Sequence, residues 1–297
     1  MSTGKSKAII NTRNIAILFC ALVTASCAPT DANNASEKKA AADIVINSEL
    51  DFIPLNPARG DAAPQAGILW GDIRSDVPSG VLLKFADGFS SPPHIHNITY
   101  RAVVIEGAVH NDDPTAEKMW MGPGAFWTQP AGENHITAGR PGSVATAFLE
   151  IMRGPYLVQP ASQAFDTGER PINLQAENVV WLDAADVNWV KTGTSGKSAS
   201  LAFLWGDTQN GKKNGTFLKL PPQKTVSLKG NAAWLRAVVI KGNINYHGDT
   251  DLTPLETGSY FGSQDGGTHV VTCKAAEDCV LYISTEGKYD VQAASPK

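Results

Sequence analysis

The stretch PPHIHNITYRAVVIEG, residues 92–107, decides the fold class of this chain of 297 residues. Its second half is rich in Val, Ile and Tyr and ends at a glycine, which is typical of a β-strand followed by a turn. Its first half places His94 and His96 one residue apart, so on an extended chain both imidazoles point to the same side, together with Tyr100. Two interpretations follow: a metal site beside a strand, or imidazoles buried in a core.

A second stretch, GPGAFWTQPAGENH at residues 122–135, supplies a third imidazole. The Pro-x-Gly turn at residues 130–132 leads directly to His135. Two imidazoles from one strand and a third from a neighbouring strand can form one face of a metal's coordination sphere. Buried without a metal, the three side chains would each need hydrogen-bond partners. The sequence therefore favours a metal site made by His94, His96 and His135.

Most of the chain is present twice. LWGD occurs at residues 69–72 and again at 204–207, and RAVVIEG at 101–107 is matched by RAVVIKG at 236–242, a shift of 135 residues in both cases. This period is far longer than that of a solenoid repeat, so each copy is a domain. Both copies consist of short apolar runs separated by Gly, Pro, Asn and Asp, which predicts β-sandwiches or barrels.

The predicted organisation is a leader, a tether and two all-β domains in tandem. The composition, 42% hydrophobic and 18% charged, is that of a globular protein. The predicted segments are an export signal at 1–27, a flexible tether at 28–44, a first domain at 45–155, a linker at 156–175 and a second domain at 176–290.

The N-terminus has the pattern of an export signal. Lys5, Lys7 and Arg13 precede the apolar run IAILFCALV at residues 15–23, and small residues lead to Cys27. The run is too short to span a bilayer as a helix. VTAS followed by Cys27 resembles a bacterial lipoprotein signal, although Thr stands where Leu is usual. A soluble periplasmic or secreted product is the alternative.

The cysteines favour the lipoprotein interpretation. Cys20 leaves with the signal, and export favours a disulfide between Cys273 and Cys279, which lie close in sequence. Cys27 is then the odd cysteine, and lipidation at the first mature position explains it. By analogy with bacterial lipoproteins, Ala28 permits sorting to the outer membrane. We therefore expect a periplasmic protein attached to the membrane only through a lipid.

The charge pattern argues against a nucleic-acid partner. The net charge is −4 at pH 7 and the chain contains no long basic run. After the N-terminus, no segment approaches the ~20 apolar residues that a spanning helix needs. The expected partner is a small molecule.

The histidine segments resemble the two motifs of the cupin superfamily. Tyr100 stands where the first motif has Glu, and Gly139 where the second has Asn. The positions that match are Gly88, His94, His96, Gly107, Gly124, Pro130, Gly132 and His135. The chain is similar to bacterial double cupins (bicupins), both the anti-sigma-factor type and uncharacterised two-cupin proteins. The resemblance implies two jelly-roll barrels and one mononuclear metal. Cupins often form homodimers by sheet-on-sheet packing, and the sequence leaves open whether this chain does.

The resemblance also suggests the metal. A three-histidine set occurs in cupin oxygenases with Fe(II), so Fe(II) is the favoured divalent ion, with Zn, Mn and Ni as alternatives. Tyr100 is the candidate catalytic residue, as a weak oxygen ligand, a hydrogen-bond donor to substrate or a support for the ligands; simple core packing is the alternative.

In the second copy the histidine pair aligns with Lys229 and Asn231, and only His269 remains. That barrel is expected to be structural, or to hold a metal-free pocket.

Several further residues are weaker candidates. His110 is a fourth ligand if its strand continues through Gly107, and otherwise a surface or supporting residue. Glu133 and Glu150 are the candidate carboxylates near the site. Aromatic side chains near the site line a pocket or pack in the core, and His247 looks like a loop residue. The aromatic residues are Trp120, Phe126 and Trp127.

Three functions fit these features. A mononuclear Fe(II) dioxygenase acting on a small organic substrate needs little beyond the metal itself. A metal-dependent sensor or ligand-binding protein without turnover is the first alternative. A metal-dependent isomerase is the second, although no carboxylate is placed beside the histidines with certainty.

Overall fold

The computed structural model describes residues 42–192, 198–231, 234–264 and 266–295, which belong to one compact unit. These residues form strands and four short 3₁₀ helices, so the all-β prediction is confirmed. None of the described helices is long and apolar enough to cross a bilayer. The predicted export signal, Cys27 and nearly all of the tether lie outside the described residues. The helices are η1 (Asn47–Glu49), η2 (Pro57–Ala62), η3 (Ala161–Gln163) and η4 (Ala176–Asn178).

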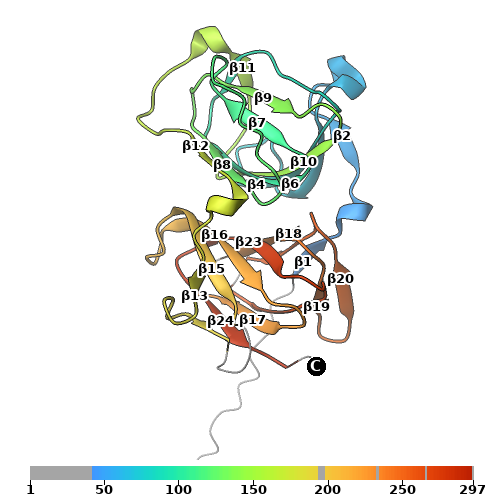
Figure 1. The fold of residues 1–297 in the computed structure, drawn as a ribbon, viewed down its shortest axis with the longest axis vertical. Helices are drawn as coiled ribbons and strands as arrows, with labels where there is room; N and C mark the ends of the chain where they lie inside the picture. The colour runs from blue at the N-terminus through green and yellow to red at the C-terminus, as the bar shows by residue number, and fades with distance from the viewer. Residues whose placement is uncertain (1–41, 193–197, 232–233, 265, 296–297) are drawn as a thin grey trace, which may run out of the picture. The chain divides into compact units, whose positions relative to one another are not determined.

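The first barrel is built on a seven-stranded sheet in the order β12-β8-β6-β10-β4-β3-β2. Two short antiparallel pairs, β5 with β11 and β7 with β9, lie on the other side of the barrel (Figure 1). The strands are β2 (Phe52–Pro54), β3 (Gln65–Trp70), β4 (Ser79–Phe85), β5 (His94–His96), β6 (Tyr100–Glu106), β7 (Val109–Asp112), β8 (Phe126–Gln129), β9 (Ile136–Gly139), β10 (Ala145–Ile151), β11 (Val158–Pro160) and β12 (Ile172–Leu174).

The second barrel has a seven-stranded sheet in the order β1-β21-β18-β23-β16-β15-β13 and a six-stranded sheet in the order β14-β24-β17-β22-β19-β20. The strands are β1 (Asp43–Val45), β13 (Leu182–Asp183), β14 (Val190–Lys191), β15 (Ser200–Gly206), β16 (Lys213–Leu220), β17 (Thr225–Gly230), β18 (Leu235–Lys241), β19 (Ile244–His247), β20 (Leu252–Leu255), β21 (Tyr260–Ser263), β22 (Thr268–Cys273), β23 (Cys279–Glu286) and β24 (Tyr289–Ala293).

The sequence repeat is a repeat of strand order. The run β8-β6-β10-β4-β3 in the first barrel corresponds strand by strand to β21-β18-β23-β16-β15 in the second. The two LWGD segments end β3 and β15, and both contain a glycine with positive φ, 72° at Gly71 and 83° at Gly206. A Cβ at these glycines would lie 2.3 Å from the backbone oxygen of Pro78, directly before β4, and 2.1 Å from that of Lys213 in β16. Any larger residue would therefore disturb the strand pairing in each barrel.

The two large sheets pack against each other through their outer faces. Leu82, Val103 and Phe148 of the first sheet share one buried cluster with Phe217 and Tyr282 of the second, while each barrel keeps a separate interior core. Because both faces of these sheets are covered, their strands read as continuous apolar runs rather than alternating ones. Every residue of β10, for example, is buried. The two barrels of the chain are thus joined by sheet-on-sheet packing.

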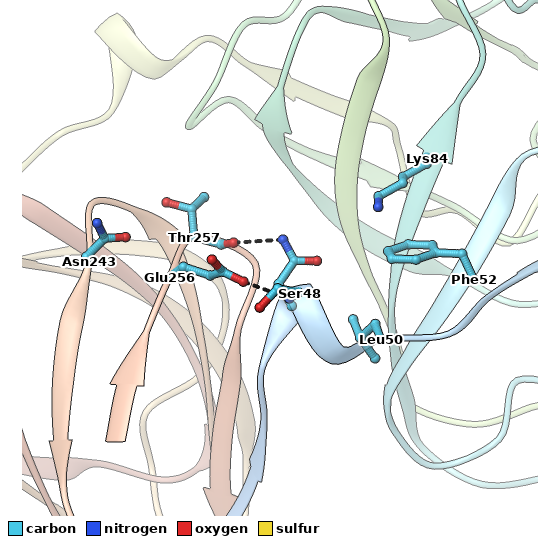
Figure 2. A pocket seen from close by; sticks show the side chains of 8 residues that line it. Ser48, Leu50, Phe52, Lys84, Asn243, Glu256 and Thr257 are labelled. Carbon is cyan, nitrogen blue, oxygen red and sulfur yellow. Dashed lines mark hydrogen bonds between the residues drawn. The ribbon is translucent and has the colours of Figure 1, made fainter. Parts of the chain in front are cut away.

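Two segments join sheets in a way that the sequence did not indicate. β1 precedes the first barrel in the chain but pairs with β21 of the second. Beside it, the Ser48 backbone N–H donates to Glu256 Oε1 at 2.7 Å and Asn47 Nδ2 donates to the Thr257 carbonyl at 3.0 Å (Figure 2). Residues 156–175, predicted as a linker, contain β11 and β12, which pair with β5 and β8 of the first barrel.

A disulfide joins Cys273, the last residue of β22, to Cys279, the first residue of β23. The two sulfur atoms are 2.07 Å apart. Both cysteines are fully buried within the core of the second barrel. The bond therefore closes the short connection between strands of the barrel's two facing sheets.

Candidate metal centre

The backbone of two segments far apart in sequence holds the histidines together. His94 and His135 form an isolated antiparallel bridge, in which each residue's N–H donates to the other's carbonyl at 3.0 Å. The turn before His135 depends on Gly132, which has a φ of +77°. A Cβ there would lie 2.3 Å from the Phe165 carbonyl oxygen, so only glycine fits at this position of the turn.

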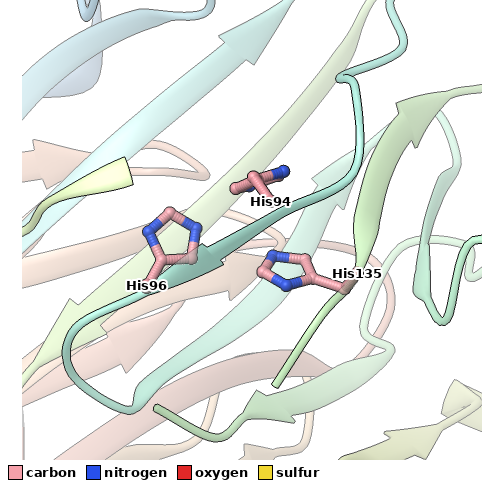
Figure 3. Close-up of side chains that lie close together, drawn as sticks. All are labelled: His94, His96 and His135. Carbon is pink, nitrogen blue, oxygen red and sulfur yellow. The ribbon is translucent and has the colours of Figure 1, made fainter. Parts of the chain in front are cut away.

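The three imidazoles converge on one point (Figure 3). One candidate ligand nitrogen from each of His94, His96 and His135 lies within 4.8 Å of the others. The ring centroids are 4.9 Å apart for His94 and His96, and 4.3 Å apart for His94 and His135. The side chains are 8%, 2% and 1% exposed, respectively. No other group of three His, Cys, Asp or Glu in the described part of the chain has this geometry.

Hydrogen bonds orient each ring with the same nitrogen outward from the centre. The Nδ1 atoms of His94, His96 and His135 contact the carbonyl oxygens of Pro92 at 2.9 Å, Leu157 at 3.0 Å and Glu133 at 3.0 Å. A carbonyl only accepts, so each Nδ1 carries the proton and donates it. All three Nε2 atoms therefore carry a lone pair. Such backbone contacts to the distal nitrogen are the usual way in which proteins fix metal-binding histidines.

The electrostatics of the cluster suit a cation. Burial and the neighbouring imidazoles lower the pKa of His96 well below its ordinary value and lower the pKa of His135 to about 3. Burial also lowers the pKa of His94. The rings are thus neutral near pH 7, as metal binding requires. His135 Nε2 is buried with no hydrogen-bond partner, an arrangement that costs about 1–3 kcal/mol unless something binds it. The donor set fits a divalent transition metal.

Tyr100 lies beside the centre, 5.2 Å from His96 between ring centroids. Its hydroxyl is directed elsewhere and donates to Asn111 Oδ1 at 2.9 Å. Asn111 Nδ2 donates to Gln129 Oε1 at 2.8 Å, and Gln129 Nε2 donates to the Glu133 carbonyl at 3.2 Å. That carbonyl also holds His135, so Tyr100 begins a chain of hydrogen bonds that ends at a candidate ligand. Burial raises the pKa of Tyr100 to about 12.

Sequence reasoning missed Tyr156. Its hydroxyl lies 3.1 Å from His96 Nε2, and its ring stacks on the His96 ring with centroids 4.3 Å apart and planes 22° from parallel. The residue belongs to the segment predicted as a linker, 60 positions from His96. The sequence around Tyr156 has no strand-like alternation that would place its side chain. The one local feature is the Gly-Pro pair directly before it, which indicates a turn.

The weaker candidates lie outside the cluster. His110 is buried, but it is adjacent to Asn111 on β7 and so faces the opposite side, where its ring is 6.1 Å from that of Trp120. Glu133 contributes its carbonyl rather than its carboxylate. Glu150 lies at the interface of the barrels, where Tyr282 donates to it at 2.6 Å. Of the described residues, none of these three weaker candidates belongs to the cluster, and the alternative of a supporting or structural residue holds for His110.

A cavity of about 490 Å³ opens beside the centre and is lined by His94, His96, Tyr100 and Tyr156. Its remaining wall is largely apolar, and Trp127 both lines it and packs in the barrel core. Phe126, in contrast, packs in the cluster between the barrels. Arg59, on the exposed helix η2, is the single acidic or basic side chain in the lining apart from the histidines.

The described residues of the second barrel form no such cluster. Its strand register places Leu228, not Lys229, opposite His269, in the way that His94 lies opposite His135. The expected alignment of the histidine pair with Lys229 and Asn231 is therefore off by one residue. His269 is fully buried, with Nδ1 2.9 Å from the Tyr246 hydroxyl and Nε2 3.0 Å from Ser263 Oγ.

His247 is likewise not the loop residue that its sequence suggested. It is the buried last residue of β19, and its Nε2 lies 2.7 Å from Thr272 Oγ1. Strand pairing between β19 and β22 brings the two side chains together.

Solved structures with the same fold include several cupins. A candidate dioxygenase from Nostoc punctiforme is 15% identical over 86% of this chain and 87% of its own, with a TM-score of 0.61. Salicylate 1,2-dioxygenase from Pseudaminobacter salicylatoxidans is 12% identical over 86% and 89%, with a TM-score of 0.55. The E. coli protein Ylba is 14% identical over 85% and 94%, with a TM-score of 0.57. At these identities the likeness concerns the fold.

The sequence comparisons give a family but no characterised relative. No curated protein matches the chain. The family model described as a domain of unknown function, DUF4437, matches residues 43–292 and so includes both barrels. The chain therefore belongs to the DUF4437 family, and its two tandem barrels share the fold of these solved structures.

Proposed function

We propose that the first barrel is a mononuclear Fe(II) dioxygenase that acts on a small organic substrate. One observation supports this above the others: three neutral imidazoles bring their unprotonated Nε2 atoms together, next to a largely apolar cavity. Three histidines leave coordination positions for other ligands, and iron bound there would activate both O₂ and a chelating substrate.

The chain's own residues would bind and orient the substrate. Tyr100, Trp127 and Tyr156 give the cavity aromatic walls, which suit a flat, mostly apolar molecule. Arg59 supplies a positive charge in the lining and favours a substrate that carries an anionic group. A related mutant of salicylate 1,2-dioxygenase, 13% identical to this chain with a TM-score of 0.54, was solved with gentisate. Gentisate and salicylate are therefore the first compounds to try.

The test combines metal content with turnover. Protein purified without oxygen is analysed for metal, loaded with Fe(II), and assayed for oxygen uptake with gentisate, salicylate and a panel of small enolisable compounds. The proposal expects about one iron per chain and uptake that depends on substrate. Tightly held metal with no uptake on any substrate would move the assignment to metal-dependent ligand binding. Substrate isomerised without oxygen consumption would favour the isomerase.

We further propose that the protein is exported and attached by a lipid on Cys27 to the periplasmic side of the outer membrane. The signal-like residues 1–27 motivate this, and the disulfide between Cys273 and Cys279 supports it, because disulfides persist in oxidising compartments. Mass spectrometry of the mature N-terminus from a bacterial host tests it. An unmodified N-terminus after cleavage would reject the anchor, and a retained leader in the cytosol would reject export.

A further inference from the structure

The metal centre lacks the carboxylate that its motif usually provides. Tyr100 occupies that position, and its hydroxyl is engaged with Asn111 Oδ1 at 2.9 Å. The three imidazoles account for the ligands on β5 and at the start of β9. Another oxygen faces the cluster, the hydroxyl of Tyr156, which comes from the segment after β10.

The position of this hydroxyl matches that of a ligand. It lies 3.1 Å from His96 Nε2. Two donor atoms bonded to one metal ion at about 2.1 Å are about 3.0 Å apart in an octahedral site and about 3.4 Å apart in a tetrahedral one. The separation is therefore the one expected for neighbouring ligands of the same ion, as well as for a hydrogen bond.

Metal binding would remove the present partner of Tyr156. Its hydroxyl makes one hydrogen bond among the described residues, to the Nε2 lone pair of His96. That lone pair is the one a metal would take, because His96 Nδ1 is committed to the Leu157 carbonyl. The half-buried hydroxyl would then need a new partner, and a cation at the cluster is the nearest candidate.

The surrounding backbone is built to hold Tyr156 in place. The Tyr156 N–H donates to the Ile73 carbonyl at 2.7 Å. The side chain of Asn97 binds both neighbours of Tyr156, accepting from the Leu157 N–H at 2.9 Å and donating to the Pro155 carbonyl at 3.0 Å. Asn97 directly follows His96, so the ligand and the tyrosine are fixed to one another through a single side chain.

We propose that Tyr156 is the fourth protein ligand of the metal, through its phenolate oxygen, in place of the missing carboxylate. On ligation the O–H bond breaks, the oxygen–metal bond forms, and the proton leaves to solvent. This inference rests on the proposed metal centre. It differs from that proposal in assigning a role to a residue outside both cupin motifs, contributed by the connection between the barrels.

The experiment is spectroscopic. Purified protein is loaded with ferric iron, its iron content is measured, and visible absorption and resonance Raman spectra are recorded for the wild type, Tyr156→Phe and Tyr100→Phe. An iron-bound phenolate gives a visible charge-transfer band with tyrosinate vibrations in the Raman spectrum. Tyr100→Phe is the matched control, because both rings contact His96 and the Tyr100 hydroxyl has another partner.

The expected result is a tyrosinate signature in the wild type and in Tyr100→Phe that is lost in Tyr156→Phe, while iron stays bound by the three histidines. Wild type with one iron per chain and no tyrosinate signature would overturn the inference and leave the metal centre intact. A signature that persists in Tyr156→Phe, or disappears in Tyr100→Phe alone, would overturn it as well. Failure to bind any iron would reject the metal centre itself. A wild-type spectrum without the signature overturns the inference even if a variant fails to fold, and Tyr100→Phe alone tests whether a signature that is present belongs to Tyr100.

Discussion

The two barrels share a strand order but treat their equivalent histidines differently. In the first barrel, Nε2 of His135 is buried with no hydrogen-bond partner. In the second, His269 contacts hydroxyls through both nitrogens, Tyr246 at Nδ1 and Ser263 at Nε2. The barrel without the three-histidine cluster therefore satisfies its remaining imidazole with protein groups. The comparison indicates that the unpaired Nε2 of His135 is available to bind a metal ion.

The substitutions that separate the barrels are adjacent in space. Tyr246 lies at the position that Asn111 occupies in the first barrel, and Ser263 at the position of Gln129. In the first barrel these amides form a chain that ends at the carbonyl behind His135. In the second barrel the hydroxyls bind the imidazole directly. The side chains at these two positions thus hold the candidate ligand His135 through its backbone neighbour in the first barrel. In the second barrel they form hydrogen bonds to the imidazole of His269 itself.

The largest expected effect is the loss of bound metal when one histidine of the cluster is removed. His96→Ala removes one of the three imidazoles of the cluster and should reduce the bound metal from about one ion per chain to none, since the two remaining imidazoles hold the ion too weakly. Elemental analysis after dialysis measures this. His269→Ala is the matched control in the second barrel and should retain the ion. Equal metal content in both variants would mean that the barrels do not differ as described.

A second prediction concerns the interface between the barrels. Glu150 is fully buried and accepts from Tyr282 of the other barrel, and the charges of Arg236 and Arg101 act on it. Glu150→Ala should lower the free energy of unfolding by about 3 kcal/mol, because it leaves buried partners unpaired. Urea unfolding checks this, with Glu150→Gln as the conservative control that keeps an acceptor for Tyr282. Identical losses for the two variants would show that the acceptor does not matter.

A third prediction tests the supporting amides. Gln129→Leu removes the donor to the Glu133 carbonyl that also positions His135, so metal affinity should fall about tenfold without loss of stoichiometry. Competition with a chelator measures the affinity. Ser263→Ala, the corresponding change in the second barrel, should leave it unchanged. An effect of Ser263→Ala as large as that of Gln129→Leu would contradict the distinction between the barrels.

The smallest expected effect concerns the cavity. Arg59→Ala should weaken the binding of salicylate to the metal-loaded protein about tenfold, or about 1.4 kcal/mol, because it removes a charge-assisted contact. Binding of salicylamide, which lacks the carboxylate, should not change. Calorimetry with both compounds measures the difference, and Arg153→Ala provides an exposed arginine outside the cavity as control. An equal loss for salicylamide would remove the argument for an anionic substrate.

The sequence by itself determined the features that depend on residues close together in the chain and on the spacing of repeated motifs. The alternation of side chains along a strand placed His94, His96 and Tyr100 on one side, and their rings do lie together. The match of LWGD and RAVVI between the halves predicted two copies of one domain, and the strand order repeats accordingly. These features follow from local backbone geometry and from spacing, which a linear sequence records directly.

Only the tertiary structure decided which distant segments meet. β1 joins the second barrel, Tyr156 contacts His96 from the predicted linker, and Leu228 rather than Lys229 lies opposite His269. Periodicity specifies the face to which a side chain points, but strand register and the path of a connecting segment depend on pairing and packing across the whole fold. The candidate ligands could be read from the sequence, whereas the groups that orient and complete them could not.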